Sequence, residues 1–139
     1  MTMFHTDEVS FEVPEGWVDR TINILAPPEH PSGFTLVMSR QALNGKELAP
    51  FVAGALATLA KEWPRFVVLG QRDRKVGPLQ GREARVKWAP KGQPFYQHQV
   101  YVAYYGTALI FTATTAFRFA LQCEGFLDQA LSAVRFRRQ

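Results

Sequence analysis

The side chains able to do nucleophilic or metal chemistry are few and lie far apart along the chain. None of the three histidines, His5, His30 and His98, has a second histidine at the spacing of a metal-binding motif. The single cysteine, Cys123, lies in a predicted helix beside Leu121, without a histidine close to it in the sequence. We interpret Cys123 as a small buried apolar residue rather than a nucleophile. The sequence therefore predicts no metal site and no cofactor.

Acid–base and phosphate chemistry also lack a convincing pattern. Five carboxylates lie in and around the first predicted strand and its turn: Asp7, Glu8, Glu12, Glu15 and Asp19. Two of them could pair for acid–base chemistry, but carboxylates in turns are normally solvated. Neither of the glycine-rich motifs that cradle phosphates is present. We expect a protein that is not an enzyme.

A basic stretch between residues 72 and 91 is the one candidate nucleic-acid surface. Its seven cations are followed closely by aromatic residues, an arrangement on which bases can stack: Arg72, Arg74, Lys75, Arg82, Arg85, Lys87 and Lys91, with Trp88, Phe95 and Tyr96. No glycine–aromatic RNA-binding motif accompanies them. We favour the simpler interpretation, a solvent-facing side of a strand, and expect no nucleic-acid partner.

Length and composition bound the class of protein. The 139 residues are typical of a single domain, here 1–139, that buries a core without a disulfide. No apolar run approaches the roughly 20 residues of a membrane span, and the N-terminus does not resemble a secretory signal, so we expect a cytoplasmic protein. Apolar residues make up 47% and charged residues only 20%. This surplus of apolar over charged residues indicates either a dense core or an apolar surface.

The predicted elements alternate hairpin strands with two helices. Apolar residues at spacings of three and four predict a helix over residues 47–63, which Pro64 ends. A second helix is expected from residue 117 or 118 to 132, followed by a short extended tail over 133–136. Strands are expected over 9–13, 21–25, 34–40, 66–69, 82–88, 95–105 and 107–115, with an irregular proline-rich loop over 26–33. This order predicts an α+β fold with an antiparallel sheet.

Two predicted strands are partly apolar on both faces. Alternation places Ile22 and Ile24 on one face of residues 21–25, and Leu25 on the other. The strand over 34–40 likewise divides into apolar Leu36 and Met38 against a mixed face. One face must pack on the helices, so the other is covered or is an exposed apolar surface of the kind that usually marks a binding site.

A third strand carries amides beside an aromatic ring. Gln97, Gln99 and Tyr101 share one face of residues 95–105, and His98 and Val100 share the other. Such groups could donate and accept hydrogen bonds to an apolar guest with a few polar atoms. An ordinary half-exposed strand is the alternative.

The order of these segments resembles a known family. Residues 9–17 (VSFEVPEGW), 21–24 (TINI), 34–40, 63–66 (WPRF) and the Gln99-Val100 pair resemble the DcrB-related domain, and more closely the Eag (effector-associated gene) chaperones of bacterial type VI secretion. The resemblance covers nearly the whole chain. It implies a PsbP-like α+β fold, a homodimer, and a cytoplasmic chaperone that shields the N-terminal hydrophobic (transmembrane) helices of a secreted toxin and aids its loading onto the secretion spike.

The resemblance also implies which residues line the client groove. These are Ile22 and Ile24 of the strand, Leu59 and Trp63 of the first helix, and Gln99, to which we add its neighbour Gln97. Ala55 stands one turn before Leu59, where relatives are expected to carry a polar amide, so hydrogen bonding shifts to Gln97 and Gln99. The protein itself is not expected to insert stably into a membrane.

Two other functions fit the same residues. A carrier or sensor could hold a small apolar ligand in the same cavity, and a regulatory module could dock a folded partner through its basic face. A neighbouring gene for a large toxin with hydrophobic N-terminal segments would favour the chaperone, whereas a small ligand co-purifying in native mass spectrometry would favour the carrier.

Overall fold

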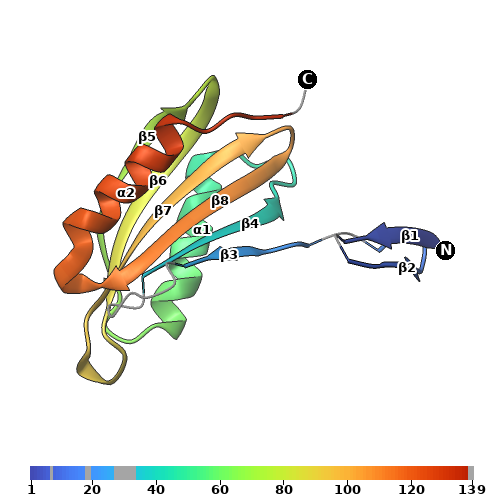
Figure 1. Ribbon diagram of the computed structural model, residues 1–139. Coiled ribbons are helices and arrows are strands. Elements are labelled where there is room, and N and C mark those ends of the chain that lie inside the picture. Colours follow the sequence, from blue (N-terminus) through green and yellow to red (C-terminus); the bar gives the residue numbers. More distant parts are fainter. Residues whose placement is uncertain (7, 18–19, 27–33, 138–139) are drawn as a thin grey trace.

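The protein is an α+β domain built on one antiparallel sheet, as the sequence predicts. The computed structural model describes residues 1–6, 8–17, 20–26 and 34–137. Six strands pair in the order β3-β4-β8-β7-β6-β5, and β1 and β2 form a separate two-stranded hairpin. Figure 1 shows this hairpin standing away from the body. The strands are β1 (Thr2–His5), β2 (Ser10–Val13), β3 (Asn23–Leu25), β4 (Thr35–Ala42), β5 (Val67–Val76), β6 (Leu79–Trp88), β7 (Phe95–Tyr104) and β8 (Thr107–Ala116).

One helix lies on each face of the sheet. Val52 and Leu56 of α1 (Leu48–Glu62) are buried in a cluster with Tyr101 of β7. Cys123 and Leu127 of α2 (Ala120–Ser132) are buried in a cluster with the neighbouring residues of β7 that point the other way, such as Val100. Because successive side chains of a strand point to opposite faces, the two helices cover opposite sides, with α2 in front and α1 behind in Figure 1.

Neither helix is centred over the β3–β4 end of the sheet. α1 packs on β6 and β7, and α2 packs on β7 and β8, so both are centred away from β3 and β4. We call the two sides of the sheet the α1 face and the α2 face. On the α1 face this end extends beyond α1, and on the α2 face Phe34 and Leu36 still reach the cluster under α2.

A tight turn closes the long hairpin of β7 and β8. Tyr105 and Gly106 have φ angles of 48° and 82°, the left-handed pair that a two-residue type I′ turn requires. Glycine adopts this conformation without steric cost, which explains why Gly106 stands at the predicted turn.

Several boundaries differ from the predictions. The sequence analysis missed β1, whose four residues lack the regular apolar alternation that identified β2. β5 continues through the basic stretch to Val76, because each of its residues finds a pairing partner on β6 apart from one bulge near Gly70. The second helix begins with a 3₁₀ turn, η2 (Phe117–Phe119), and a second such turn, η1 (Pro90–Gly92), precedes β7.

The remaining differences concern the loop and the tail. The tail after α2 is not a strand, but Val134 and Phe136 pack against the core beneath α2. Of the predicted loop over 26–33, residues 27–33 lie outside the described residues. Among the described residues, neither helix has the length and apolar character needed to cross a membrane.

Candidate functional site

A row of paired residues crosses the α1 face from the sheet edge toward α1. Ile24 of β3 pairs with Val37 of β4, which pairs with Thr112 of β8, and Thr112 pairs with Gln99 of β7. Paired residues of neighbouring strands share a face. The row ends at Ala84 of β6, which is buried under α1, so the whole row belongs to the α1 face.

The edge of this row is strongly exposed. The exposed fraction is 68% for Ile24 and 59% for Ile22, which directly precedes β3. Side chains exposed to this degree at an edge strand bury little apolar area when the chain folds, so most of that area stays free for a partner. The structure therefore places the two predicted isoleucines on a surface and not in the core.

The two predicted glutamines lie further in and are hydrogen-bonded to one another. Tyr101 donates its hydroxyl proton to Gln99 Oε1 at 2.7 Å, Gln99 Nε2 donates to Gln97 Oε1 at 2.5 Å, and Gln97 Nε2 donates to Thr114 Oγ1 at 3.0 Å. Only 8% of Gln97 and 3% of Gln99 is exposed. Burial raises the pKa of Tyr101 to about 12, so this hydroxyl remains a donor at all ordinary pH values. We call this chain of groups the amide ladder.

The two predicted helix residues lie near the C-terminal end of α1. Leu59 is partly exposed, and Trp63 packs its ring 4.2 Å from that of Trp88 and 6.1 Å from that of Phe66. Ala55 is partly buried against the cluster under α1. The aromatic group thus fixes the end of α1 on the sheet, while the small Ala55 brings no hydrogen-bonding side chain to this face.

Together these residues combine an exposed apolar edge with preorganised polar groups on one face. The isoleucines supply contact area without directional demands. The amide ladder holds hydrogen-bonding groups in fixed positions on the same face, with β4 and β8 between the ladder and the isoleucines. Such a surface can hold an apolar segment, but it offers no nucleophile and no pair of free carboxylates for chemistry.

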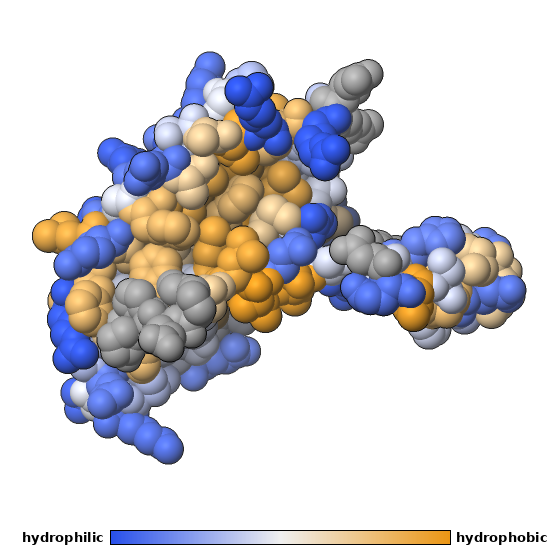
Figure 2. All heavy atoms as spheres, viewed as in Figure 1, coloured by the Kyte–Doolittle hydropathy of each residue, from blue (hydrophilic) through white to orange (hydrophobic). Residues whose placement is uncertain are grey.

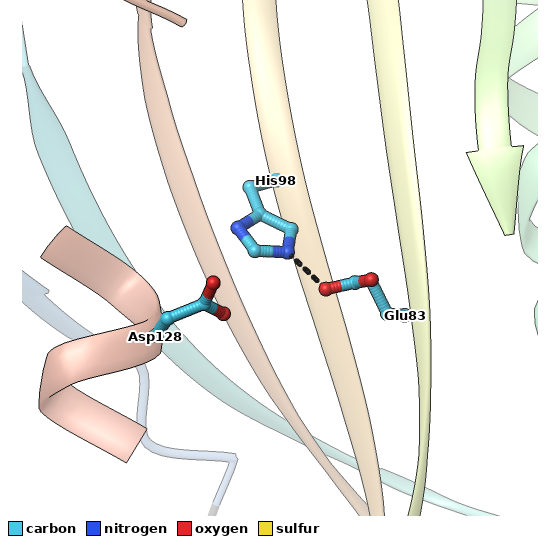
Figure 3. A group of neighbouring side chains, drawn as sticks. All are labelled: Glu83, His98 and Asp128. Carbon is cyan, nitrogen blue, oxygen red and sulfur yellow. Dashed lines mark hydrogen bonds and ion pairs between the residues drawn. The ribbon is translucent and has the colours of Figure 1, made fainter. Parts of the chain in front are cut away.

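The α2 face carries a charged cluster that the sequence analysis did not anticipate. His98 donates or accepts at Nε2 with Glu83 Oε1 at 2.7 Å, and Asp128 of α2 approaches the imidazole from the other side (Figure 3). His98 and Glu83 are 1% and 3% exposed. The register that pairs β6 with β7, and the packing of α2 over them, unites residues 45 positions apart in the chain, for which no local motif exists.

Arginines neutralise the carboxylates of this cluster. Arg72 Nε contacts Glu83 at 2.5 Å, and Arg74 Nη1 bridges Glu83 at 3.1 Å and Asp128 at 2.7 Å. Burial alone would raise the pKa of the Glu83 carboxyl, but the hydrogen bonds from His98 and Arg72 outweigh it, so the pKa of Glu83 lies below its ordinary value. The cluster ties α2 to β5, β6 and β7 through charge.

The same geometry decides whether the cluster suits a metal ion. One ligand atom each of Glu83, His98 and Asp128 lies within 4.8 Å of the others, and His98 Nδ1 is buried without a hydrogen-bond partner among the described residues. Arg74 already occupies both carboxylates, so a cation would have to displace a guanidinium and then share the site with it. The residues present therefore fit an ion-pair network better than a metal site.

The basic stretch has a similar explanation. Arg82 contacts Asp73 at 2.8 Å and Arg85 contacts Glu124 at 3.3 Å, in addition to the pairs of Arg72 and Arg74. On the α2 face the stretch is not simply solvent-facing as predicted, because Asp128 and Glu124 of α2 lie over Arg74 and Arg85. Arg82 lies on the α1 face, and its carboxylate partner Asp73 belongs to β5. Arginines committed to carboxylates are poor candidates for phosphate contacts.

Cys123 lies where the sequence predicted. It is fully buried in α2, and burial raises the pKa of its thiol to about 12. A thiol with so high a pKa is neutral at physiological pH and therefore a weak nucleophile.

The chain is similar to known proteins in both sequence and fold. The profile of the DcrB family matches residues 8–133. A Pseudomonas aeruginosa protein named Effector EagT6 is 29% identical over 118 residues, which span 83% of this chain and 82% of that protein. The crystal structure of PA94, a Pseudomonas aeruginosa protein of unknown function, has a TM-score of 0.81 at 26% identity and covers 100% of this chain and 99% of its own.

A more distant structure shares the fold alone. LpqN, involved in cell envelope biogenesis of Mycobacterium tuberculosis, has a TM-score of 0.54 at 16% identity, covering 75% of this chain and 65% of its own. The profile match extends from the second strand of the hairpin to the end of α2, across every strand and helix described above except β1. The chain belongs to the DcrB family.

Proposed function

We propose that this protein is a cytoplasmic chaperone of a type VI secretion effector, which binds the effector's N-terminal hydrophobic helices before export and aids loading onto the secretion spike. The observation that carries the proposal is the exposed apolar edge of the α1 face, which shares that face with the amide ladder. The family membership and the relative named Effector EagT6 support it, because both agree with the Eag resemblance of the sequence. The protein acts by binding, as a homodimer, and not as an enzyme.

The energetics of shielding fit such a surface. Each Å² of apolar helix surface exposed to water costs about 25 cal/mol of free energy, so covering a few hundred Å² stabilises the complex by several kcal/mol. The helix backbone already satisfies its own hydrogen bonds, and its chaperone needs only apolar area and a few polar contacts. Ile22, Ile24, Leu59 and Trp63 supply the area in this proposal. Gln97 and Gln99 supply the polar contacts by exchanging hydrogen bonds of the amide ladder for bonds to the client.

Co-expression with a client segment tests the proposal. The probe is the apolar N-terminal segment of a type VI effector encoded beside this chain's gene, carrying an affinity tag. We expect the segment to stay in the soluble fraction only when the chaperone is expressed with it. The tagged segment should then retain the chaperone on the affinity resin. The effector's remaining domains without the apolar segment serve as the control and should retain no chaperone. A segment that aggregates equally with and without the chaperone would contradict the proposal.

A further inference from the structure

A pocket of about 340 Å³ opens at the end of the sheet where β6 passes into η1. Its described lining consists of three apolar residues, two cations and a glycine: Val67, Ala89, Pro94, Arg65, Lys87 and Gly92. That volume suits a small ligand or a single group of a larger one. The described lining contains no carboxylate, so the pocket combines apolar walls with positive charge.

Three segments that are far apart in the chain meet at this end of the sheet. Ala89 N–H donates to Pro64 O at 3.0 Å, which fixes the turn after α1 beside the end of β6. Phe117 N–H donates to Pro94 O at 3.0 Å, which fixes η2 beside the start of β7. Figure 1 shows the end of α1 and the β6–β7 connection at the same, lower end of the molecule, and Figure 2 shows that this end is mainly hydrophilic. Backbone hydrogen bonds of the fold therefore hold the pocket walls.

The two cations of the pocket have no carboxylate partner among the described residues. Lys87 Nζ lies 4.2 Å from the centre of the Phe117 ring, and neither Lys87 nor Arg65 takes part in an ion pair. Lys91, which directly precedes Gly92, likewise forms no ion pair within the described ranges. The arginines further along β5 and β6 differ, because each of them contacts a carboxylate. Positive charge without a partner thus lies at this end of the sheet.

The backbone of Arg65 has a left-handed conformation, with a φ angle of 55°. The other non-glycine residues with a positive φ in the described ranges are Asn44, Lys91 and Tyr105. Each precedes a glycine that also has a positive φ, as in two-residue turns. Arg65 precedes Phe66 instead. Glycine would adopt this conformation without steric cost, and residues that hold it despite the cost cluster at ligand-binding sites.

A phosphate monoester matches this combination of groups. Such a group carries about 1.5 to 2 negative charges at pH 7, which the two unpaired cations of the pocket would balance. The planar guanidinium of Arg65 can donate two parallel hydrogen bonds to phosphate oxygens, and the ammonium of Lys87 adds a compact charge. The apolar walls suit the carbon group to which the phosphate is attached.

We propose that this pocket binds a phosphate monoester, with Arg65 and Lys87 on the phosphate oxygens and the apolar lining on the attached carbon group. The site belongs to the α2 side of the sheet, because Lys87 pairs with Tyr96, which is buried under α2. It is therefore separate from the client groove on the α1 face, and the proposal does not rest on the chaperone function. A soluble phosphate ester and a phosphatidic acid headgroup share this chemistry.

Isothermal titration of the purified full chain with phenyl phosphate at low ionic strength measures this binding. We expect saturable binding to the wild type. Arg65→Gly and Lys87→Gln should each raise the dissociation constant by about tenfold or more, because each removes a charged hydrogen-bond donor. Arg65→Gly should also melt no lower than the wild type, since glycine accepts the left-handed backbone. Lys75→Gln is the matched control: it removes an exposed cation of β5 that has no ion pair among the described residues and lies outside the pocket, and it should leave the affinity unchanged.

Co-sedimentation with vesicles distinguishes the two sources of phosphate. Retention on phosphatidic acid vesicles but not on phosphatidylcholine vesicles, abolished by Arg65→Gly and by excess phenyl phosphate, assigns the site to a lipid headgroup. Binding of phenyl phosphate without retention on either vesicle assigns it to a soluble ester. A wild type that binds neither probe, or an equal loss of binding in Lys75→Gln, overturns the proposal. If circular dichroism shows that Lys87→Gln does not fold, Val67→Asp replaces it, because it places a carboxylate in the lining and should weaken binding equally.

Discussion

Replacing Ile24 by aspartate separates a binding role from a folding role. Complete burial of an isoleucine side chain stabilises by about 1.5–3 kcal/mol. With 68% of Ile24 exposed in the free chain, about one third of that gain, below about 1 kcal/mol, belongs to folding. The other two thirds, about 1–2 kcal/mol, is available to a client helix. The free variant should therefore melt within about 4 °C of the wild type.

The effect on client binding should be much larger. In addition to the lost apolar contact, the variant forces a carboxylate against an apolar helix, which costs several kcal/mol without a partner charge. A combined loss of about 3 kcal/mol or more corresponds to at least a 100-fold weaker complex, since 1.4 kcal/mol is tenfold. Isothermal titration with the soluble client segment, or its retention in co-purification, measures this loss.

Val67→Asp is the matched control for this prediction. Val67 is 50% exposed on β5, the strand at the opposite edge of the same sheet, and pairs with Lys87. It adds the same charge to an edge strand outside the proposed groove, so client binding should be unchanged. Undiminished client affinity of a folded Ile24→Asp protein would refute the groove assignment, and a collapsed melt would show that Ile24 belongs to the core.

Three further predictions concern the interior. Because folding lowers the pKa of Glu83, its contribution to stability is complete above the unfolded value near 4.5 and is lost as pH falls through the lower folded value. Urea melts should show Glu83→Gln destabilised by about 3 kcal/mol at pH 7. The variant should also lose less stability in acid than the wild type does. Cys123 should react with a disulfide reagent only after unfolding, and Cys123→Ser should lower stability by about 1–3 kcal/mol with client binding intact; rapid labelling of the native protein would contradict its burial. Zinc addition and chelation should both leave the melting temperature unchanged, because Arg74 occupies the carboxylates beside His98; a stabilisation that His98→Gln abolishes would establish a metal site instead.

The sequence predicted local features well because they depend on local chemistry. The 3.6-residue apolar period located α1 to within one residue at each end, and the strand alternation correctly placed Gln97, Gln99 and Tyr101 on one face. The burial of the glutamines was not predictable, because it depends on where α1 crosses the sheet. The charged cluster was not predictable for the same reason, because Glu83, His98 and Asp128 meet only through strand register and the position of α2.

The apolar character of both faces of the β3–β4 end now has a physical explanation. A single helix packs on each side of a six-stranded sheet, and the two helices are centred on β6–β7 and β7–β8. On the α1 face the β3–β4 end lies beyond the helix. On the α2 face Phe34 and Leu36 pack against the cluster under α2, while Leu25 of β3 stays exposed. Ile24 and Leu25 are adjacent on β3 and point to opposite faces, at 68% and 62% exposure. In the proposed function Ile24 contacts the client, so substitution of Leu25, which points to the opposite face, should leave client binding intact.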